Sequence, residues 1–578
     1  MKSFIRISIL ALVLVSTVFA GQALAGWKPQ VVLGPGIGSP AQTPYHQTWN
    51  RTLSADTLYV LTGFYYVDST YSITIPEGTT VLGDTASVLC IQRGAQIHAT
   101  GSAERPIVFA PLKDPGNRNP GDWGGVIILG EAPCNRVEPV IEGGLIEGHF
   151  GGNDPADDSG EFYYCRIEYP GYRIEEGNEV NGLTMGGVGS ETEIHHVQVS
   201  YSNDDSFEWF GGVQGGGRGP EDTGNYLVAL GGIDDVFDTD FGHQGCHQFC
   251  FHIRDPLWSD LEGQANGFES DSYKPAATTP PVTDPTFASC TIVGPERTDD
   301  TTLPPVHAFE YAACIRRCSL QSLFNSVIMG FPYGLTIRDG CTQTGAINDD
   351  MNFHYTSIQA SQRPSGSTSV HDEGRWAGVT AWFDAEPGNN PLHSQPRLPS
   401  SVGLTDMSDL NDPDPTPLVT SELVTTPANW AHSECVDCNF EQVSYRGAFA
   451  PGLTMDEQWT AGWTEFDPQN AVYDEPETGA DDAVASGKVS SQNYPNPFNP
   501  VTNIAYSVQQ AGPVTIEVYN ISGKLVKTLL SEELTAGASG TVVWDGTDEH
   551  GQKCASGVYF ARVSTPDLTQ SHKMVMLK

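Results

Sequence analysis

The chain has 578 residues and carries 71 acidic against 29 basic side chains, a formal net charge of −42 at pH 7. Such a surface excludes duplex nucleic acid as a partner, because binding it depends on the neutralisation of phosphates by Lys and Arg. Acidic polymers are repelled as well, unless divalent cations bridge them. The length allows several domains, and a high net charge keeps a protein soluble.

The first expected element is a secretory signal peptide in residues 1–25. Lys2 and Arg6 precede an apolar run from Ile7 to Phe19, and small residues follow at Ala23-Leu24-Ala25. The run is shorter than the roughly 18–20 apolar residues that a membrane span requires, so cleavage after this motif is expected rather than an anchor. We therefore expect no integral membrane segment in the mature chain.

Residues 26–466 are the expected body of the protein. Short β-prone runs rich in Val, Ile, Leu and Phe recur along it, and paired glycines such as Gly124-Gly125 and Gly231-Gly232 mark the corners between them. This pattern predicts a right-handed parallel β-helix, a solenoid in which each coil adds two or three short strands. A β-sandwich is the alternative, since it also has many short strands separated by turns.

The end of the body has a looser pattern. Residues 357–429 are rich in Pro, Ser, Thr and Asp, and we expect them to form long loops that decorate the last coils or cap the open end. Trp459 and Trp463 supply aromatic bulk suited to covering a terminal coil. Residues 467–491 are acidic and rich in Ala, Gly and Ser, which is typical of a linker.

Residues 492–578 are expected to form a separate C-terminal domain. Apolar residues alternate with polar ones in several short runs between Thr502 and Leu577, and tight turns are indicated at Asn520–Gly523 and Asp545-Gly546. This pattern predicts a small immunoglobulin-like β-sandwich. The whole chain is therefore predicted to be all-β.

Three motifs of the C-terminal domain are specific: Asn493–Pro500, Val518–Lys524 and the segment from Trp544 to Tyr559. They resemble the type IX (Por) secretion C-terminal sorting domain, a family similar to the immunoglobulin-like domain of flagellar hook-capping proteins. The resemblance implies passage through the periplasm and across the outer membrane by the type IX secretion machinery. It also implies a secreted protein, either extracellular or held at the outer cell surface. An ordinary appended immunoglobulin-like domain is the alternative.

Four segments of the body carry a second resemblance: Gly121–Gly130, Val197–Gly212, Asp234–Gly242 and Asn266–Asp271. They resemble a group of large, uncharacterised secreted bacterial proteins that is predicted to be β-helical. This resemblance supports the predicted fold of the body and implies no specific activity.

Two acidic turns lie 30 residues apart, a plausible length for one coil. Their carboxylates are Asp204, Asp205, Glu208, Asp234, Asp235, Asp238 and Asp240. If successive coils stack, equivalent residues lie about 4.8 Å apart, where two like charges repel by on the order of 4 kcal/mol at an effective dielectric constant of 20. Hard oxygen ligands favour Ca²⁺, so we expect calcium here, with Glu269 and Asp271 a coil further on, and no organic cofactor. The alternative is that each Asp only accepts hydrogen bonds from the backbone of its own turn.

A catalytic interpretation uses some of the same residues. Its set is Asp204, Asp205, Asp234, Asp235, His243 and Arg254. Their order resembles the acids, histidine and arginine of polygalacturonase-type hydrolases, which implies general acid and base roles for the paired carboxylates and substrate binding for Arg254. The sequence departs from that family, because Gln244 follows His243 where the family has Gly, and Asp255-Pro256 follows Arg254 where the family has Ile-Lys. A solvent-exposed histidine is the other interpretation of His243.

The sequence therefore favours a non-catalytic surface protein, such as an adhesin, glycan binder or envelope scaffold. A polysaccharide-degrading hydrolase or lyase is the alternative. Aromatic side chains at Trp209, Trp258 and Tyr273, if exposed, are candidates for stacking on sugars.

The chain has 12 cysteines, which are expected to form disulfides in an oxidising compartment. Three pairs are close enough in sequence to be linked locally or across neighbouring strands: Cys246/Cys250, Cys314/Cys318 and Cys435/Cys438.

Overall fold

The computed structural model describes residues 28–141, 147–175, 178–215, 225–259, 263–360, 376, 378–389, 398–473, 490–494, 500–508, 511–520, 524–535, 538–564 and 569–576. The predicted signal peptide lies outside these ranges. The chain divides into two compact units, residues 1–476 and 477–578. Among the described residues, no helix has the length and apolar character needed to span a membrane.

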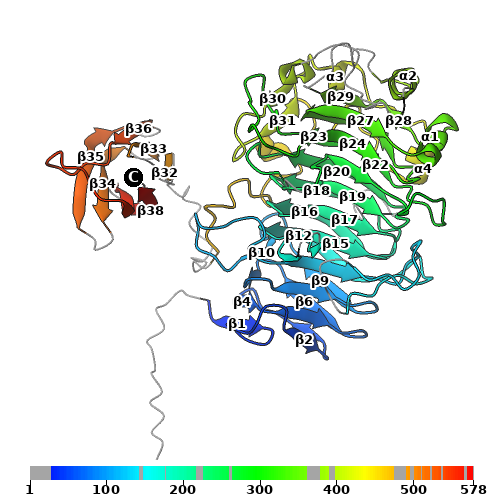
Figure 1. The fold of residues 1–578 in the computed structure, drawn as a ribbon, viewed down its shortest axis with the longest axis horizontal. Coiled ribbons are helices and arrows are strands. Elements are labelled where there is room, and N and C mark those ends of the chain that lie inside the picture. The colour runs from blue at the N-terminus through cyan, green and yellow to red at the C-terminus, as the bar shows by residue number, and fades with distance from the viewer. Residues whose placement is uncertain are drawn as a thin grey trace, which may run out of the picture. The chain divides into compact units, whose positions relative to one another are not determined.

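The first unit is a parallel β-helix built from two long sheets (Figure 1). The smaller one, sheet B, contains in spatial order β2 (Pro44–Gln47), β5 (Phe64–Val67), β8 (Val88–Ile91), β11 (Gly125–Leu129), β15 (Leu183–Gly186), β17 (Phe207–Phe210), β19 (Phe237–Asp240), β21 (Phe268–Ser270), β24 (Tyr311–Ile315) and β27 (Tyr333–Ile337). Each strand pairs in parallel with the corresponding strand of the next coil, for example β17 with β19 and β19 with β21. This parallel pairing confirms the predicted β-helix and excludes the sandwich for the body.

Sheet A is longer and bends into two faces. Its strands are β1 (Gln30–Leu33), β3 (Arg51–Thr52), β4 (Leu58–Leu61), β6 (Ser72–Pro76), β7 (Thr80–Gly83), β9 (Gln96–Thr100), β10 (Ile107–Pro111), β12 (Gly160–Glu168), β16 (Glu193–Ser200), β18 (Asn225–Leu230), β20 (Cys246–Ile253), β22 (Thr286–Ala288), β23 (Thr291–Val293), β25 (Ser322–Phe324), β26 (Val327–Phe331), β28 (Phe353–His354) and β29 (Ser357–Ala360). The bend is seen where β20 pairs first with β22 and then with β23.

A column of left-handed residues marks this bend. Seven non-glycine residues on successive coils have φ between 47° and 60°: Tyr164, His196, Tyr226, Phe249, Ser289, Asn325 and Tyr355. Bulky residues rarely adopt this conformation. The first four rings stack in sequence along the column, with centroids 4.3, 4.4 and 5.1 Å apart, and such ring pairs contribute about 0.5–1.5 kcal/mol each.

The interior of the β-helix is filled by side chains that alternate with outward-facing ones along each strand. Phe207, Phe237 and Phe268 are fully buried and stack on successive coils of sheet B, with ring centroids 5.4 and 5.6 Å apart. α1 (Gly340–Ile347) follows β27 and α2 (Val379–Ala385) follows β29, and both lie toward the end of the β-helix opposite β2 (Figure 1). Val379 and Phe383 of α2 belong to the same core cluster as the interior phenylalanines.

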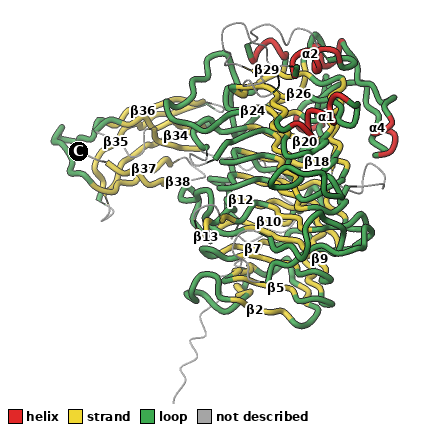
Figure 2. The backbone as a smooth tube through the Cα atoms, turned by 45° about the vertical axis from the view of Figure 1, so that its right-hand side comes forward, coloured by secondary structure: helices red, strands yellow, loops and turns green. Residues whose placement is uncertain are grey.

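Residues 398–473 pack along the outer face of sheet A. They contain η2 (Pro399–Val402), β30 (Leu404–Asp406), β31 (Asp414–Pro417), α3 (Glu422–Thr425), α4 (Ser433–Asp437) and η3 (Met455–Glu457), and are otherwise loop (Figure 2). Trp463 lies 5.8 Å from the ring of Tyr164 and 5.7 Å from that of His196, and Trp459 lies 5.3 Å from that of Tyr226. The prediction that these tryptophans cover a terminal coil is therefore wrong, because they cover the bend of coils in the middle of the helix.

The first residues of the expected linker are bound to the β-helix. Arg118 donates hydrogen bonds to the carbonyl oxygens of Pro468 and Ala471. The Tyr473 hydroxyl donates to the carboxylate of Glu168, with O···O distances of 2.5 and 2.6 Å, and Glu168 is completely buried. Residues 474–489 of the linker lie outside the described residues. A small antiparallel hairpin, β13 (Arg173–Glu175) with β14 (Asn178–Glu179), completes the strands of this unit.

The second unit has two antiparallel sheets. One contains β32 (Ser490–Tyr494), β33 (Thr502–Val508) and β36 (Ala538–Trp544), and the other β35 (Leu525–Leu534), β34 (Gly512–Asn520), β37 (Gly557–Ser564) and β38 (Thr569–Met576). Ile504 and Trp544 of the first sheet share one core with Ile516 and Met574 of the second. This confirms the predicted small β-sandwich. Residues 495–499 of the first C-terminal motif lie outside the described residues.

Candidate functional site

The register of sheet B aligns acidic side chains from three successive coils. Glu208 of β17 is the pairing partner of Asp238 in β19, which in turn is the partner of Glu269 in β21. These residues alternate with the buried phenylalanines and therefore face away from the interior. The stacking of coils thus brings together carboxylates that are about 30 positions apart in the sequence.

A second column lies in the turns just before these strands. The side-chain oxygen of Asn181 accepts a hydrogen bond from the backbone N–H of Asp205 (3.2 Å), Asp205 accepts from the N–H of Asp235 (2.9 Å), and Asp235 accepts from the N–H of Asn266 (2.6 Å). Asn266 continues the column by accepting from the N–H of Tyr311 at 3.0 Å. We call Asn181, Asp205, Asp235 and Asn266 the Asx ladder. Asp205 and Asp235 thus bond the backbone of the next coil, in addition to any bond within their own turn.

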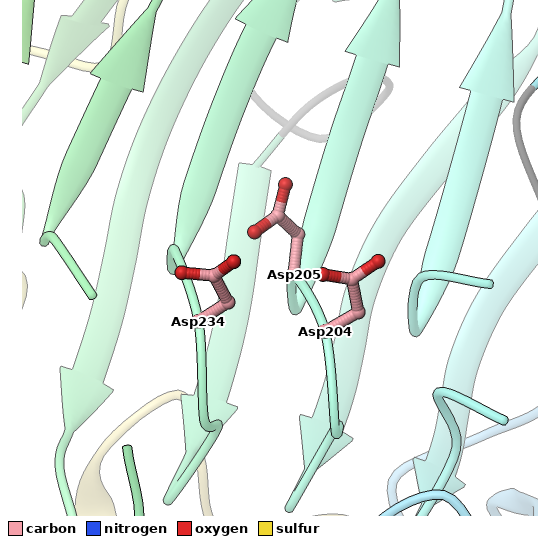
Figure 3. A group of neighbouring side chains, drawn as sticks. All are labelled: Asp204, Asp205 and Asp234. Atoms are coloured by element: carbon pink, nitrogen blue, oxygen red, sulfur yellow. The ribbon is translucent and has the colours of Figure 1, made fainter. Parts of the chain in front are cut away.

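The two columns, together with Asp204 and Asp234 beside the ladder, form three groups of carboxylates, each with oxygens within 4.8 Å of one another. The groups are Asp204/Asp205/Asp234, Asp205/Glu208/Asp238 and Asp235/Asp238/Glu269. Figure 3 shows the first group, in which Asp204 and Asp205 come from the turn before one strand and Asp234 from the turn before the next. Six of the seven residues in the predicted calcium set lie in these groups. Asp240 lies outside them, two positions after Asp238 in β19.

Burial raises the pKa values of these carboxyl groups. It is the main cause for Asp205 and Asp238, and the negative charges of neighbouring aspartates raise both further. For Asp235, burial raises the pKa to about 6, although the N–H of Asn266 acts in the opposite direction. The pKa of Asp240 is raised to about 8, again mainly by burial. Burial and mutual repulsion thus oppose the ionisation of these carboxyl groups, and a cation bound among them would relieve both effects.

Arginines neutralise one end of the acidic face. Arg316 forms ion pairs with Glu269 and with Asp271, the latter at 2.7 Å from Nε, and Arg317 forms another with Asp271. Arg254 is completely buried and donates to the carbonyl oxygens of Gly232 (2.5 Å) and Asn266 (2.9 Å). Within the described part of the chain, the arginine ion pairs of this face lie at the end formed by Glu269 and Asp271.

Sequence reasoning missed several of these partners. The sequence spacing did not indicate that Arg316 and Arg317 lie beside the acidic residues, because the two arginines are some 80 residues further along the chain than Asp235. The ladder positions of Asn181 and Asn266 did have a signal. In each of the four coils an Asn or Asp stands two residues before the first inward Leu or Phe of the strand.

His243 does not reach the acidic face. It is completely buried, its Nδ1 lies 3.1 Å from the carbonyl oxygen of Gly211, and its Nε2 lies 2.9 Å from Nε2 of His247. Burial lowers the pKa of His243 to about 4. The interpretation as a solvent-exposed histidine is therefore wrong, and the structure does not bring His243 together with the acid pairs.

The three aromatic residues suggested for sugar stacking differ in exposure. Trp209 is only 1% exposed and packs inside the helix, 5.6 Å from the ring of His243, so it is unsuited to this role. Trp258 is 40% exposed. Tyr273 is half-buried beneath the guanidinium of Arg136, which lies 3.9 Å from its ring centroid.

The observed disulfides differ from the expected pairs, because they join cysteines that are 192 and 23 residues apart in the sequence. Cys246 is bonded to Cys438, and Cys318 to Cys341. The three local pairings suggested by sequence spacing are therefore wrong. In β20, Cys246 and Cys250 lie on one strand, with Cys250 in the interior, so their side chains belong to different environments.

Comparison with known proteins agrees with this architecture. The family model described as "Pectate-lyase like beta helix domain" matches residues 45–384, more than half of the chain. The chain belongs to the pectate-lyase-like β-helix family. The model described as "FlgD Ig-like domain" matches residues 500–567 of the second unit, in agreement with the hook-capping resemblance. No curated protein matches this pectate-lyase-like chain.

Two solved structures match short parts of the chain. Dimeric latent PorU from Porphyromonas gingivalis is 23% identical over 17% of this chain and 10% of that chain, with a TM-score of 0.15. PorZ, a surface component of the type-IX secretion system of Porphyromonas gingivalis, is 22% identical over 15% of this chain and 12% of that chain, with a TM-score of 0.12. The pectate-lyase-like chain thus spans about a tenth of each of these proteins, and so low a similarity carries no argument about its function.

Proposed function

We propose that this protein is an exported, surface-held or extracellular β-helix that binds calcium on the acidic face of sheet B and acts as a non-catalytic scaffold or glycan binder. The observation that carries the proposal is the set of three carboxylate groups with oxygens within 4.8 Å of one another. The β-helix holds these oxygens in place through the register of its strands and the hydrogen bonds of the Asx ladder.

Charge and ligand chemistry support calcium as the cation. Two carboxylates about 4 Å apart repel by on the order of 4 kcal/mol at an effective dielectric constant of 20, and a divalent cation between them reverses the sign of that interaction. Ca²⁺ accepts several oxygen ligands in flexible geometry, whereas Mg²⁺ demands a tighter octahedral arrangement. The best candidate group is Asp205/Glu208/Asp238, because the arginine ion pairs lie further along the face at Glu269 and Asp271.

Calorimetric titration and thermal melting test this site. We expect Ca²⁺ to bind with a dissociation constant of about 10⁻⁴–10⁻³ M, as in other extracellular modules, and to raise the melting temperature more than Mg²⁺ does. Asp238→Asn should weaken binding, whereas Asp56→Asn, at an exposed turn, should leave it unchanged. An unaltered melting temperature at millimolar Ca²⁺ would exclude a stabilising calcium site.

Export is supported by the FlgD-like match of residues 500–567 and by the two disulfides, which form in oxidising compartments. We propose that the second unit directs the chain to the type IX secretion machinery. Removing residues 490–578 in the native host should leave the β-helix in the periplasm, detectable by cell fractionation. Normal surface delivery of the truncated chain would contradict this role.

Glycan binding is supported by the exposed indole of Trp258, since flat aromatic faces suit sugar rings. Retention on immobilised polysaccharides in affinity electrophoresis measures it. Trp258→Ala should lose the retention, and Leu257→Ala, a neighbouring side chain that is 75% exposed, serves as the matched control. Equal retention of both variants would remove Trp258 from the proposal.

A polysaccharide hydrolase or lyase is the second candidate, favoured by the family of the body and by the raised pKa of Asp235, which suits a general acid. Release of reducing or unsaturated sugars from a panel of polysaccharides distinguishes the two functions. Activity that disappears in both Asp204→Asn and Asp235→Asn would favour the enzyme over the scaffold.

A further inference from the structure

Two cysteines occupy the same inward position on successive coils of the β-helix. Cys250 follows the left-handed residue Phe249 in β20, and Cys290 follows the left-handed residue Ser289 between β22 and β23. The strand pairs on both sides of the bend, β20 with β22 and β20 with β23, keep one register, which sets Cys250 opposite Cys290. Both side chains are completely buried in the interior core.

The two thiols are neighbours in this register. Burial raises the pKa of the Cys250 thiol, and the hydrogen bond and charge of Cys290 raise it further. Neighbouring parallel strands lie about 4.8 Å apart, within the range of about 4.4–6.8 Å between Cα atoms that a disulfide accepts. Cys165 stands in the same inward column, but its partners in register are Ile107 and Val197, so it has no thiol opposite it.

We propose that Cys250 and Cys290 are joined by a disulfide in the exported protein, a covalent link between two successive coils inside the core. The inference rests on the proposed export, because the reaction needs an oxidant, here a disulfide-bearing thiol oxidoreductase of the oxidising compartment. One cysteine thiolate attacks the oxidant's disulfide and forms a mixed disulfide, and the second thiolate displaces the oxidant's sulfur. The two cysteines lose two electrons and two protons in total, and the oxidant becomes a dithiol.

Burial dictates when this bond forms. Neither sulfur is accessible to an oxidoreductase once the coils have stacked, so oxidation precedes closure of the core. The link closes the coil that contains Glu269 and Asp271, and so ties one end of the acidic face to the coil before it. Cys246–Cys438 links β20 to the segment that packs along sheet A, and Cys318–Cys341 links the turn after β24 to α1. The proposed bond is distinct from both, because it joins two coils within the interior.

Alkylation and peptide mapping of the natively exported protein test the proposal. The chain is denatured without reductant, alkylated, digested and analysed by mass spectrometry. We expect a linked Cys250–Cys290 peptide pair that is lighter by two hydrogen atoms than the separate thiol peptides. The number of alkylated cysteines should be two fewer than the eight thiols of this structure. Cys250→Ser should gain one alkylated residue, Cys290, whereas the matched variant Cys165→Ser should lose one.

Two results would overturn the inference, and they are distinguishable. If Cys246–Cys438 and Cys318–Cys341 are linked while Cys250 and Cys290 are both alkylated, the inference fails and the proposed export stands. If none of the three pairs is linked in the protein from its native compartment, both the inference and the oxidising export route fail.

Discussion

Asp235→Asn should stabilise the metal-free protein, although it removes a charge from a fully formed hydrogen-bond ladder. Asp235 is 6% exposed, and its side-chain oxygen accepts the N–H of Asn266 at 2.6 Å. An asparagine keeps this acceptor and has nearly the same shape. Asn181 and Asn266 occupy equivalent positions of the Asx ladder, so the fold accommodates an amide there.

The magnitude follows from the raised pKa of Asp235, which is about 6 in the folded protein against 3.8 for the free group. Below pH 3.8 the carboxyl is protonated in both states. As the pH rises from there to about 6, the unfolded chain releases its proton first, so the stability contributed by the protonated carboxyl is progressively lost. The loss is complete above pH 6 and corresponds to about 3 kcal/mol for roughly two pKa units.

Urea unfolding in the presence of a chelator measures this effect. At neutral pH, the free energy of unfolding of Asp235→Asn should exceed that of the parent protein by about 3 kcal/mol. The difference should shrink toward zero near pH 4. With Ca²⁺ added, both proteins should gain stability, because the proposed site of Asp205, Glu208 and Asp238 is intact in the variant. Asp56→Asn, at an exposed position, is the control and should match the parent throughout. A variant that is less stable than the parent at neutral pH without metal would refute the reasoning.

Three further substitutions test the packing of the β-helix interior and of the segment that lies along sheet A. Phe237→Ala removes the middle ring of the interior stack and should lower the free energy of unfolding in urea by about 3–5 kcal/mol. The control Leu257→Ala, at an exposed position, should change it by less than about 0.5 kcal/mol. Similar losses for the two variants would argue against a packed interior. Tyr473→Phe removes the hydroxyl that donates to the buried carboxylate of Glu168 and should weaken the attachment of residues 467–473 by about 1–3 kcal/mol. Limited proteolysis should then cleave within these residues faster than in the parent. Unchanged cleavage would show that this contact does not hold the segment. Cys438→Ser opens the long loop closed with Cys246 and should cost about 2–5 kcal/mol, measured by melting; a melting temperature equal to that of the parent would contradict a stabilising role.

The coil length was readable from the sequence because the acidic turns repeat. Asp205 and Asp235 stand 30 residues apart, and each precedes an inward Phe by two residues. If each coil has this length, residues 30 positions apart lie next to each other on stacked coils. The hydrogen bond from the N–H of Asp235 to the side chain of Asp205 confirms that these two residues are stacked neighbours. The predicted sandwich of the second unit succeeded for a similar reason, since period-2 alternation is a local signal.

The failures involve contacts that no local pattern encodes. Cys246 bonds Cys438, which the chain brings back only after passing the end of the helix and returning along sheet A. Trp463 packs on Tyr164 by the same return path. His243 lies in the interior because the loop after β19 turns inward, and its polarity is met by a carbonyl oxygen and a second histidine. Such partners depend on where long segments fold back, and residue spacing carries no information about that.

The central claim is that stacked coils hold carboxylates close enough to bind a cation. The most direct measurement is a crystal structure grown in millimolar Ca²⁺, with anomalous diffraction collected after exchange for a heavier lanthanide. The account predicts a single strong anomalous peak coordinated by oxygens of Asp205, Glu208 and Asp238. The absence of any anomalous peak along sheet B, with the side chains of Asp205, Glu208 and Asp238 well ordered and without a bound metal ion, would contradict it.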